Sequence, residues 1–131
     1  MSVGLLIITH NRIGEQLLET ATVMLETSPL ECTALDIHSD CDLDYSLQQA
    51  RLAKSKLDSG DGVLVLADMY GSTPSNIANK LATDNSVIVI TGINLPMLVR
   101  VLNYPRLNLE QLAEKARSGG SDGIMVCREQ C

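Results

Sequence analysis

Two residues that could carry out nucleophilic chemistry stand at matching places in the sequence. His10 follows the apolar run of residues 3–9, and Asp68 follows the apolar run of residues 63–67. A carboxylate that accepts the Nδ1–H of an imidazole fixes the tautomer of the ring and leaves the Nε2 lone pair free to attack an electrophile. We therefore predict that His10 and Asp68 form a nucleophilic pair, provided that the two apolar runs are neighbouring strands.

The segment Gly71-Ser72-Thr73-Pro74 suggests which electrophile the imidazole would attack. Backbone N–H groups at a helix N-terminus favour anions, and the two hydroxyls would add donors, so a phosphoryl group is expected. This scheme requires no metal ion and no cofactor. The same residues are also typical of an ordinary helix cap, and a histidine after a strand is often only a loop residue. These alternatives stay open on spacing alone.

The cysteine pattern favours reduced thiols over a metal centre. The four cysteines are Cys32, Cys41, Cys127 and Cys131. They form no C-x-x-C pair and show none of the paired spacings of a zinc ribbon or finger. A mixed site built from His38, Asp40 and Cys41 is the alternative.

The elements that must position these residues alternate along the chain. Apolar runs predict strands at residues 3–9, 30–37, 63–67 and 87–90, and apolar residues at helical spacing predict helices at 13–25, 43–57, 75–82, 94–102 and 109–116. A glycine-rich turn at 119–123 leads to a last short strand at 124–127. The expected fold is α/β: a doubly wound, mostly parallel sheet of four strands with helices on both faces plus a short C-terminal edge strand. Ligands of such sheets bind beyond the carboxyl ends of the strands, where His10 and Asp68 are expected.

The composition limits the classes of function. The chain has 131 residues and a formal net charge of -6, and we expect residues 1–131 to form one domain. Nucleic acid is not an expected partner, because affinity for phosphate backbones needs clustered Lys and Arg. No apolar run approaches the ~20 residues that span a bilayer, so no membrane insertion is expected. The sequence after Met1 shows no secretory leader, and a cytoplasmic location follows as the default expectation.

Three stretches carry a resemblance to a known family. They are residues 5–12 (LLIITHNR), 67–76 (ADMYGSTPSN) and 92–98 (GINLPML). In order and spacing they resemble the mannose-family enzyme IIA domains of the bacterial phosphoenolpyruvate-dependent sugar phosphotransferase system. Ser72 departs from the second glycine of the Gly-Gly-Ser/Thr-Pro form common in that family.

The resemblance implies a phosphoryl carrier. His10 would accept the group from the phosphohistidine of HPr, Asp68 would bind the imidazole, and Gly71, Ser72 and Thr73 would lie at the phosphoryl group. The group would then pass to a separate enzyme IIB subunit for sugar uptake. The alternative is a regulatory phosphotransferase-system protein whose phosphorylated His10 is read by another partner. A non-catalytic binding module, in which His10 only donates a hydrogen bond, is the hypothesis from a different class.

The resemblance also implies protein partners. A homodimer is expected, in which the last strand can be exchanged between subunits, and association with a membrane permease complex is compatible with the transport role. The residues expected to contact partners are Arg12, Met69, Tyr70, Pro96 and Met97, together with Ile13. Packing in the core is the alternative role of the apolar members of this set.

Overall fold

The computed structural model describes residues 2–27 and 29–128, in which strands and helices alternate up to the last helix. In order these elements are β1 (Gly4–His10), α1 (Ile13–Leu25), β2 (Cys32–Ile37), α2 (Leu43–Leu57), β3 (Val63–Ala67), α3 (Thr73–Leu81), β4 (Val87–Thr91), α4 (Leu95–Leu102) and α5 (Leu109–Asp122). The four-stranded sheet has the order β2-β1-β3-β4, and every neighbouring pair of strands is parallel. The predicted α/β fold is confirmed, and so is the assumed pairing of the first and third strands.

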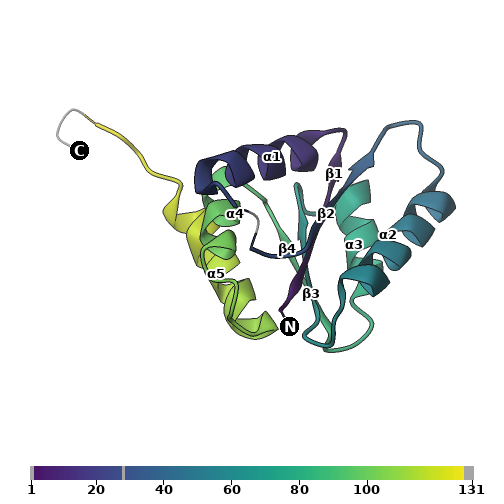
Figure 1. The fold of residues 1–131 in the computed structure, drawn as a ribbon. Helices are drawn as coiled ribbons and strands as arrows, with labels where there is room; N and C mark the ends of the chain where they lie inside the picture. The colour runs from purple at the N-terminus through teal and green to yellow at the C-terminus, as the bar shows by residue number, and fades with distance from the viewer. Residues whose placement is uncertain (1, 28, 129–131) are drawn as a thin grey trace.

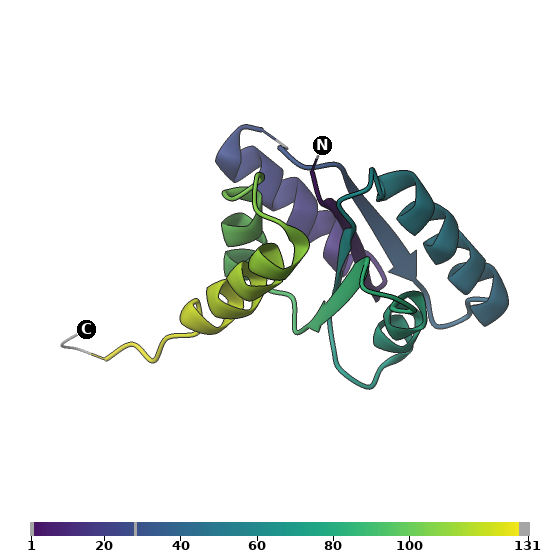
Figure 2. The same cartoon turned by 90° about the horizontal axis from the view of Figure 1, so that it is seen from below.

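The helices cover the two faces of the sheet in separate layers. Helices α1, α4 and α5 lie on one face, and α2 and α3 lie on the other (Figures 1 and 2). The central strand β1 explains why both layers are needed: Leu5 and Ile7 pack into the first layer, and Leu6 and Ile8 pack into the second. Because side chains alternate along a strand, an entirely apolar strand must be buried on both faces.

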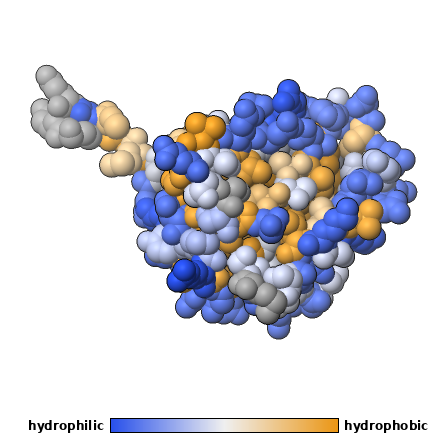
Figure 3. Space-filling view, viewed as in Figure 1, coloured by the Kyte–Doolittle hydropathy of each residue, from blue (hydrophilic) through white to orange (hydrophobic). Residues whose placement is uncertain are grey.

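The sheet reaches the surface at its edges. Five of the six residues of β2 are only half-buried, and Ile37 is the buried one. Figure 3 shows apolar residues gathered between the two helical layers on one face of the molecule, with hydrophilic residues over the helices around them.

Within the described ranges, no helix is long and apolar enough to cross a bilayer.

The C-terminal part of the chain differs from the prediction. Helix α5 continues through Gly119 and Gly120 to Asp122, and residues 124–128 form no strand but lead away from the domain (Figure 1). The two glycines serve close helix packing instead of a turn: a Cβ at Gly119 would stand 2.8 Å from the Cβ of Arg100, and one at Gly120 would stand 2.8 Å from the Cε of Met97. The expected edge strand is therefore wrong for the single chain.

Candidate functional site

The structure brings His10 and Asp68 together at the carboxyl edge of the sheet. The Nδ1 atom of His10 lies 2.7 Å from Oδ2 of Asp68, and the backbone N–H of His10 donates to the same oxygen at 3.0 Å. A carboxylate accepts only, so in the neutral ring Nδ1 carries the proton and Nε2 keeps its lone pair. The His10 side chain is 41% exposed and that of Asp68 is 12% exposed. The arrangement thus presents a nucleophilic nitrogen to solvent above a largely buried anion.

The strand register accounts for this geometry. Ile8 of β1 is paired with Ala67 of β3, so His10, the last residue of β1, and Asp68, the residue after β3, lie at the same edge of the sheet. The Ala67 carbonyl accepts the N–H of Ile93, which ties the end of β3 to the segment after β4. The other Asp68 oxygen, Oδ1, is buried and has no hydrogen-bond partner among the described residues. Both hydrogen bonds that the structure shows for this carboxylate are therefore donated by His10.

The residues at the loop before α3 differ in conformation and in contacts. Gly71 has a φ of +81° in open space, a left-handed conformation that favours glycine. Ser72 occupies the N-cap position, but its hydroxyl donates to the Met69 carbonyl at 2.5 Å rather than capping the helix. Thr73 begins the helix and lines a cleft together with His10. Of the two residues predicted to supply hydroxyl donors, only Thr73 is among those that line the cleft.

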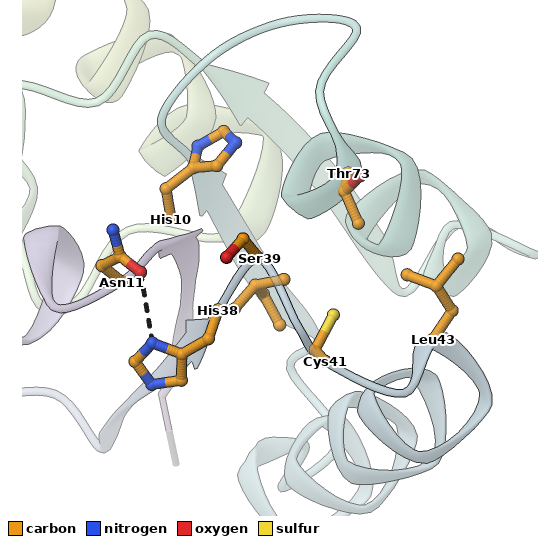
Figure 4. A pocket seen from close by; sticks show the side chains of 8 residues that line it. His10, Asn11, His38, Ser39, Cys41, Leu43 and Thr73 are labelled. Atoms are coloured by element: carbon orange, nitrogen blue, oxygen red, sulfur yellow. Dashed lines mark hydrogen bonds between the residues drawn. The ribbon is translucent and has the colours of Figure 1, made fainter.

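That cleft has a volume of about 460 Å³, and His10 forms part of its wall (Figure 4). Its lining residues are His10, Asn11, Ile37, His38, Ser39, Cys41, Leu43 and Thr73. The segment after β2 supplies three of these eight residues, His38, Ser39 and Cys41, and was missed as part of the site by sequence reasoning. The signal was present, because β2 is parallel to β1 and its carboxyl end must reach the same edge.

The segment after β2 is tied to the end of β1. The N–H of Asn11 donates to the Ile37 carbonyl at 3.0 Å, and Asn11 Oδ1 lies 3.1 Å from Nδ1 of His38. Asn11 has a φ of +47°, a left-handed conformation that asparagine tolerates better than most residues. Among the described residues no three His, Cys, Asp or Glu side chains are placed to share a metal ion, so the alternative site at His38, Asp40 and Cys41 has no support.

Charged groups beside the cleft form a small network on α1 and β2. Arg12 is exposed and binds Glu15 at 3.0 Å, and this hydrogen bond raises the pKa of Arg12 and lowers that of Glu15. Burial, followed by the adjacent Glu15 carboxyl, raises the pKa of Asp36 above its ordinary value. Arg12 is therefore accessible at the surface but already paired with a carboxylate.

The residues expected to contact partners are not all available. Met69 and Tyr70 are exposed, Tyr70 by 81%, and Ile13 and Pro96 also lie at the surface. Met97 is only 4% exposed and packs in the core against α5, so its assignment as a surface contact is wrong. The reason is the helical periodicity of α4, which turns Met97 inward and leaves its neighbour Pro96 outside.

Of the cysteines that the structure describes, Cys41 and Cys127 are free thiols, and the Cys32 thiol donates to the Leu30 carbonyl at 3.2 Å. Cys41 lines the cleft, and Cys127 lies in the exposed segment after α5. Cys131, the remaining cysteine of the sequence, lies outside the described residues.

Comparison with known proteins places the chain among phosphotransferase-system components. The chain is 33% identical over 131 residues to the PTS system mannose-specific EIIAB component of Escherichia coli (strain K12), an alignment that covers 98% of this chain and 40% of that protein. The chain thus spans about two-fifths of the length of the curated relatives that it matches first.

Solved structures share the fold. The mannose/sorbose specific IIA subunit from Enterococcus faecalis superposes with a TM-score of 0.85 at 23% identity, over 98% of this chain and 96% of that one. A PTS IIA protein associated with the fucose utilization operon of Streptococcus pneumoniae gives a TM-score of 0.79 at 25% identity, over 99% and 98% of the two chains. Residues 4–116 match the model of the EIIA-man family, described as the PTS system fructose IIA component. By this match over most of its length, the chain belongs to the EIIA-man family of phosphotransferase-system enzyme IIA components.

Proposed function

We propose that this chain carries a phosphoryl group on Nε2 of His10, accepting it from phospho-HPr and passing it to an enzyme IIB acceptor in sugar uptake. The observation that supports the proposal most directly is the 2.7 Å contact between His10 Nδ1 and Asp68 Oδ2 beneath a half-exposed imidazole. Family membership supplies the class of reaction. The contact with Asp68 supports His10 as a nucleophile of suitable tautomer, and the cleft beside it supports a place for the reaction.

The transfer step uses the His10–Asp68 pair as follows. The Nε2 lone pair attacks the phosphorus of the donor phosphohistidine, a new P–N bond forms, and the donor P–N bond breaks as its imidazole leaves. The His10 ring keeps its Nδ1 proton and becomes cationic, so the Asp68 carboxylate stabilises it more after transfer than before. No net proton is taken up or released in this exchange between two imidazoles.

The phosphoryl oxygens would be bound by donors at the start of α3. The first N–H groups of an α-helix have no intrahelical acceptor, and the positive end of the helix dipole favours an anion there. Asn76 already donates its N–H to the Ser72 carbonyl at 2.9 Å, which leaves the earlier amides of Thr73 and Ser75 for the phosphoryl group. The Thr73 hydroxyl adds a further donor on the cleft side.

The exposed side chains near the site suggest how a protein donor would dock. Met69 and Tyr70 are large, apolar and exposed in the loop that follows Asp68. Burying such side chains contributes favourable free energy to association. We assign them to contact with HPr, and Arg12 and Pro96 to the rim of the same interface.

The exposed apolar segment after α5 supports a homodimer. Ile124, Met125 and Val126 are about three-quarters exposed (75%, 74% and 77%), which is unusual for a run of large apolar residues. Pairing with the sheet of a second subunit would bury them. A Met125→Asp variant should therefore shift the protein toward monomer in sedimentation velocity, and an unchanged sedimentation coefficient would reject this dimer interface.

The experiment that tests the function is intact-mass analysis after incubation with phosphoenolpyruvate, enzyme I and HPr. The wild type should gain one phosphoryl mass that is lost in acid, and His10→Ala should gain none. His38→Ala is the matched control, because it removes the other histidine of the same cleft, and this protein should still gain the phosphoryl mass.

The outcomes separate the candidate functions. No adduct on folded wild type would overturn the carrier proposal in favour of a non-catalytic binding module. An adduct that passes to an enzyme IIB domain would support the transport role. An adduct that no such domain removes would direct the search to a regulatory partner.

A further inference from the structure

The turn after β2 forms a wall of the His10 cleft. The N–H of Cys41 donates to the His38 carbonyl at 3.0 Å, so Ser39 and Asp40 are the two central residues of a β-turn. Ser39 lines the cleft with His10, whereas Asp40 does not. Figure 4 shows the Ser39 side chain within the cleft, below the His10 ring.

This turn is held in place relative to His10. Asn11, the residue next to His10, binds the Ile37 carbonyl through its N–H and contacts the His38 ring through its side-chain oxygen, at 3.0 and 3.1 Å. Both contacts connect the end of β1 with the chain entering the turn. Ser39 is therefore presented by a segment anchored to the strand that carries His10, and little ordering is required when a ligand enters the cleft.

A phosphoryl group in the cleft would require hydrogen-bond donors, and Ser39 could supply one. No Lys or Arg is among the described residues that line it, and the nearest charged partner of His10 is the Asp68 carboxylate. A phosphoryl group there would depend on neutral donors. The Ser72 hydroxyl is committed to the Met69 carbonyl, whereas the Ser39 hydroxyl makes no hydrogen bond within the described part of the chain and is free to donate.

We propose that the Ser39 hydroxyl binds an oxygen of the phosphoryl group carried by His10, opposite the donors of Thr73 and α3. The proposal rests on the phosphoryl-carrier function proposed above and adds a binding group from a different element. The phosphoryl group would then be held from two sides of the cleft. A hydrogen bond to such an anion is stronger than one between neutral groups.

The test compares Ser39→Ala, Ser39→Thr and the control Ser121→Ala, whose serine is exposed on α5 away from the cleft. Each protein is equilibrated with HPr of known phosphorylation, and the equilibrium constant for transfer is measured along with the ³¹P NMR shift of phospho-His10. Ser39→Ala should lower the constant about tenfold, the effect of one hydrogen bond to a charged group, and should displace the ³¹P signal. Ser39→Thr should restore both values.

Each result bears on the proposal. A Ser39→Ala protein that matches wild type in both measurements would overturn it while leaving the carrier function standing. Equal losses in Ser39→Ala and Ser39→Thr, with a displaced signal in both, would also overturn it, because the hydroxyl would then have no part in the effect. A wild type that accepts no phosphoryl group would overturn the carrier function first and this inference with it.

Discussion

Replacement of Asp68 by Asn tests the electrostatic role of the carboxylate with little change of shape. An amide oxygen can still accept from Nδ1 and from the backbone N–H of His10, the two bonds that Asp68 Oδ2 accepts at 2.7 and 3.0 Å. What Asn lacks is the negative charge that stabilises the ring once phosphorylation makes it cationic. The perturbation therefore separates charge from orientation.

The magnitude follows from the burial of the pair. Asp68 is 12% exposed, so solvent screens the contact weakly. Removing the negative charge from the acceptor of a hydrogen bond to a cationic ring costs about 2 kcal/mol, which corresponds to about a 30-fold lower transfer constant. Asp68→Ala should lose more, because it also frees the ring to reorient, but should keep measurable acceptance since Nε2 remains.

The assay is rapid-quench transfer from phospho-HPr under single-turnover conditions, with the equilibrium constant measured in parallel. Urea unfolding of each variant checks that the fold is retained. An Asp68→Asn protein within about threefold of wild type would refute the electrostatic argument, given the ~2 kcal/mol expected for such a bond. Complete loss of acceptance in a folded Asp68→Ala protein would refute the division of roles between nucleophile and positioning residue.

Three further predictions concern stability. Gly71→Ala forces a left-handed φ on alanine at an open position, and urea unfolding should show a loss of about 1 kcal/mol. Leu98→Ala opens a cavity at a fully buried site of α4, and the same measurement should show a loss of about 3 kcal/mol. The fold raises the pKa of Asp36, chiefly by burial and then by Glu15. Between the ordinary carboxyl pKa and this raised pKa, the folded chain holds a proton that the unfolded chain has released. The free energy of unfolding therefore falls as the pH rises through this range. Asp36→Asn should therefore raise the Tm at pH 7, with a gain that shrinks as the pH falls toward the ordinary carboxyl value; a pH-independent gain would contradict this account.

The local pattern of the sequence was sufficient for most of the fold, and it predicted a contact between His10 and Asp68 on the assumption that their strands are neighbours. Apolar runs such as residues 63–67 have to be buried on both faces, and their alternation with helices requires parallel strands. Parallel strands end at one edge, which is why residues directly after two of them, His10 and Asp68, could be expected to meet. The strands and helices could be predicted because each depends on side chains close together in the chain, whereas the contact between His10 and Asp68 also needed the pairing of β1 with β3.

Only the tertiary structure decided the features that depend on contacts between distant segments. Gly119 and Gly120 are typical of a turn in sequence, but they lie within helix α5. They are glycines there because α4 packs too closely to leave room for a Cβ. Ser72 has the residue type of a phosphoryl ligand, yet its hydroxyl is bound within its own loop. The turn at Ser39 joins the cleft because β2 pairs with β1 in a register that brings His10 level with Ile37. A pattern of residue types specifies which elements form, whereas the packing of those elements against one another determines which of their side chains remain free to act.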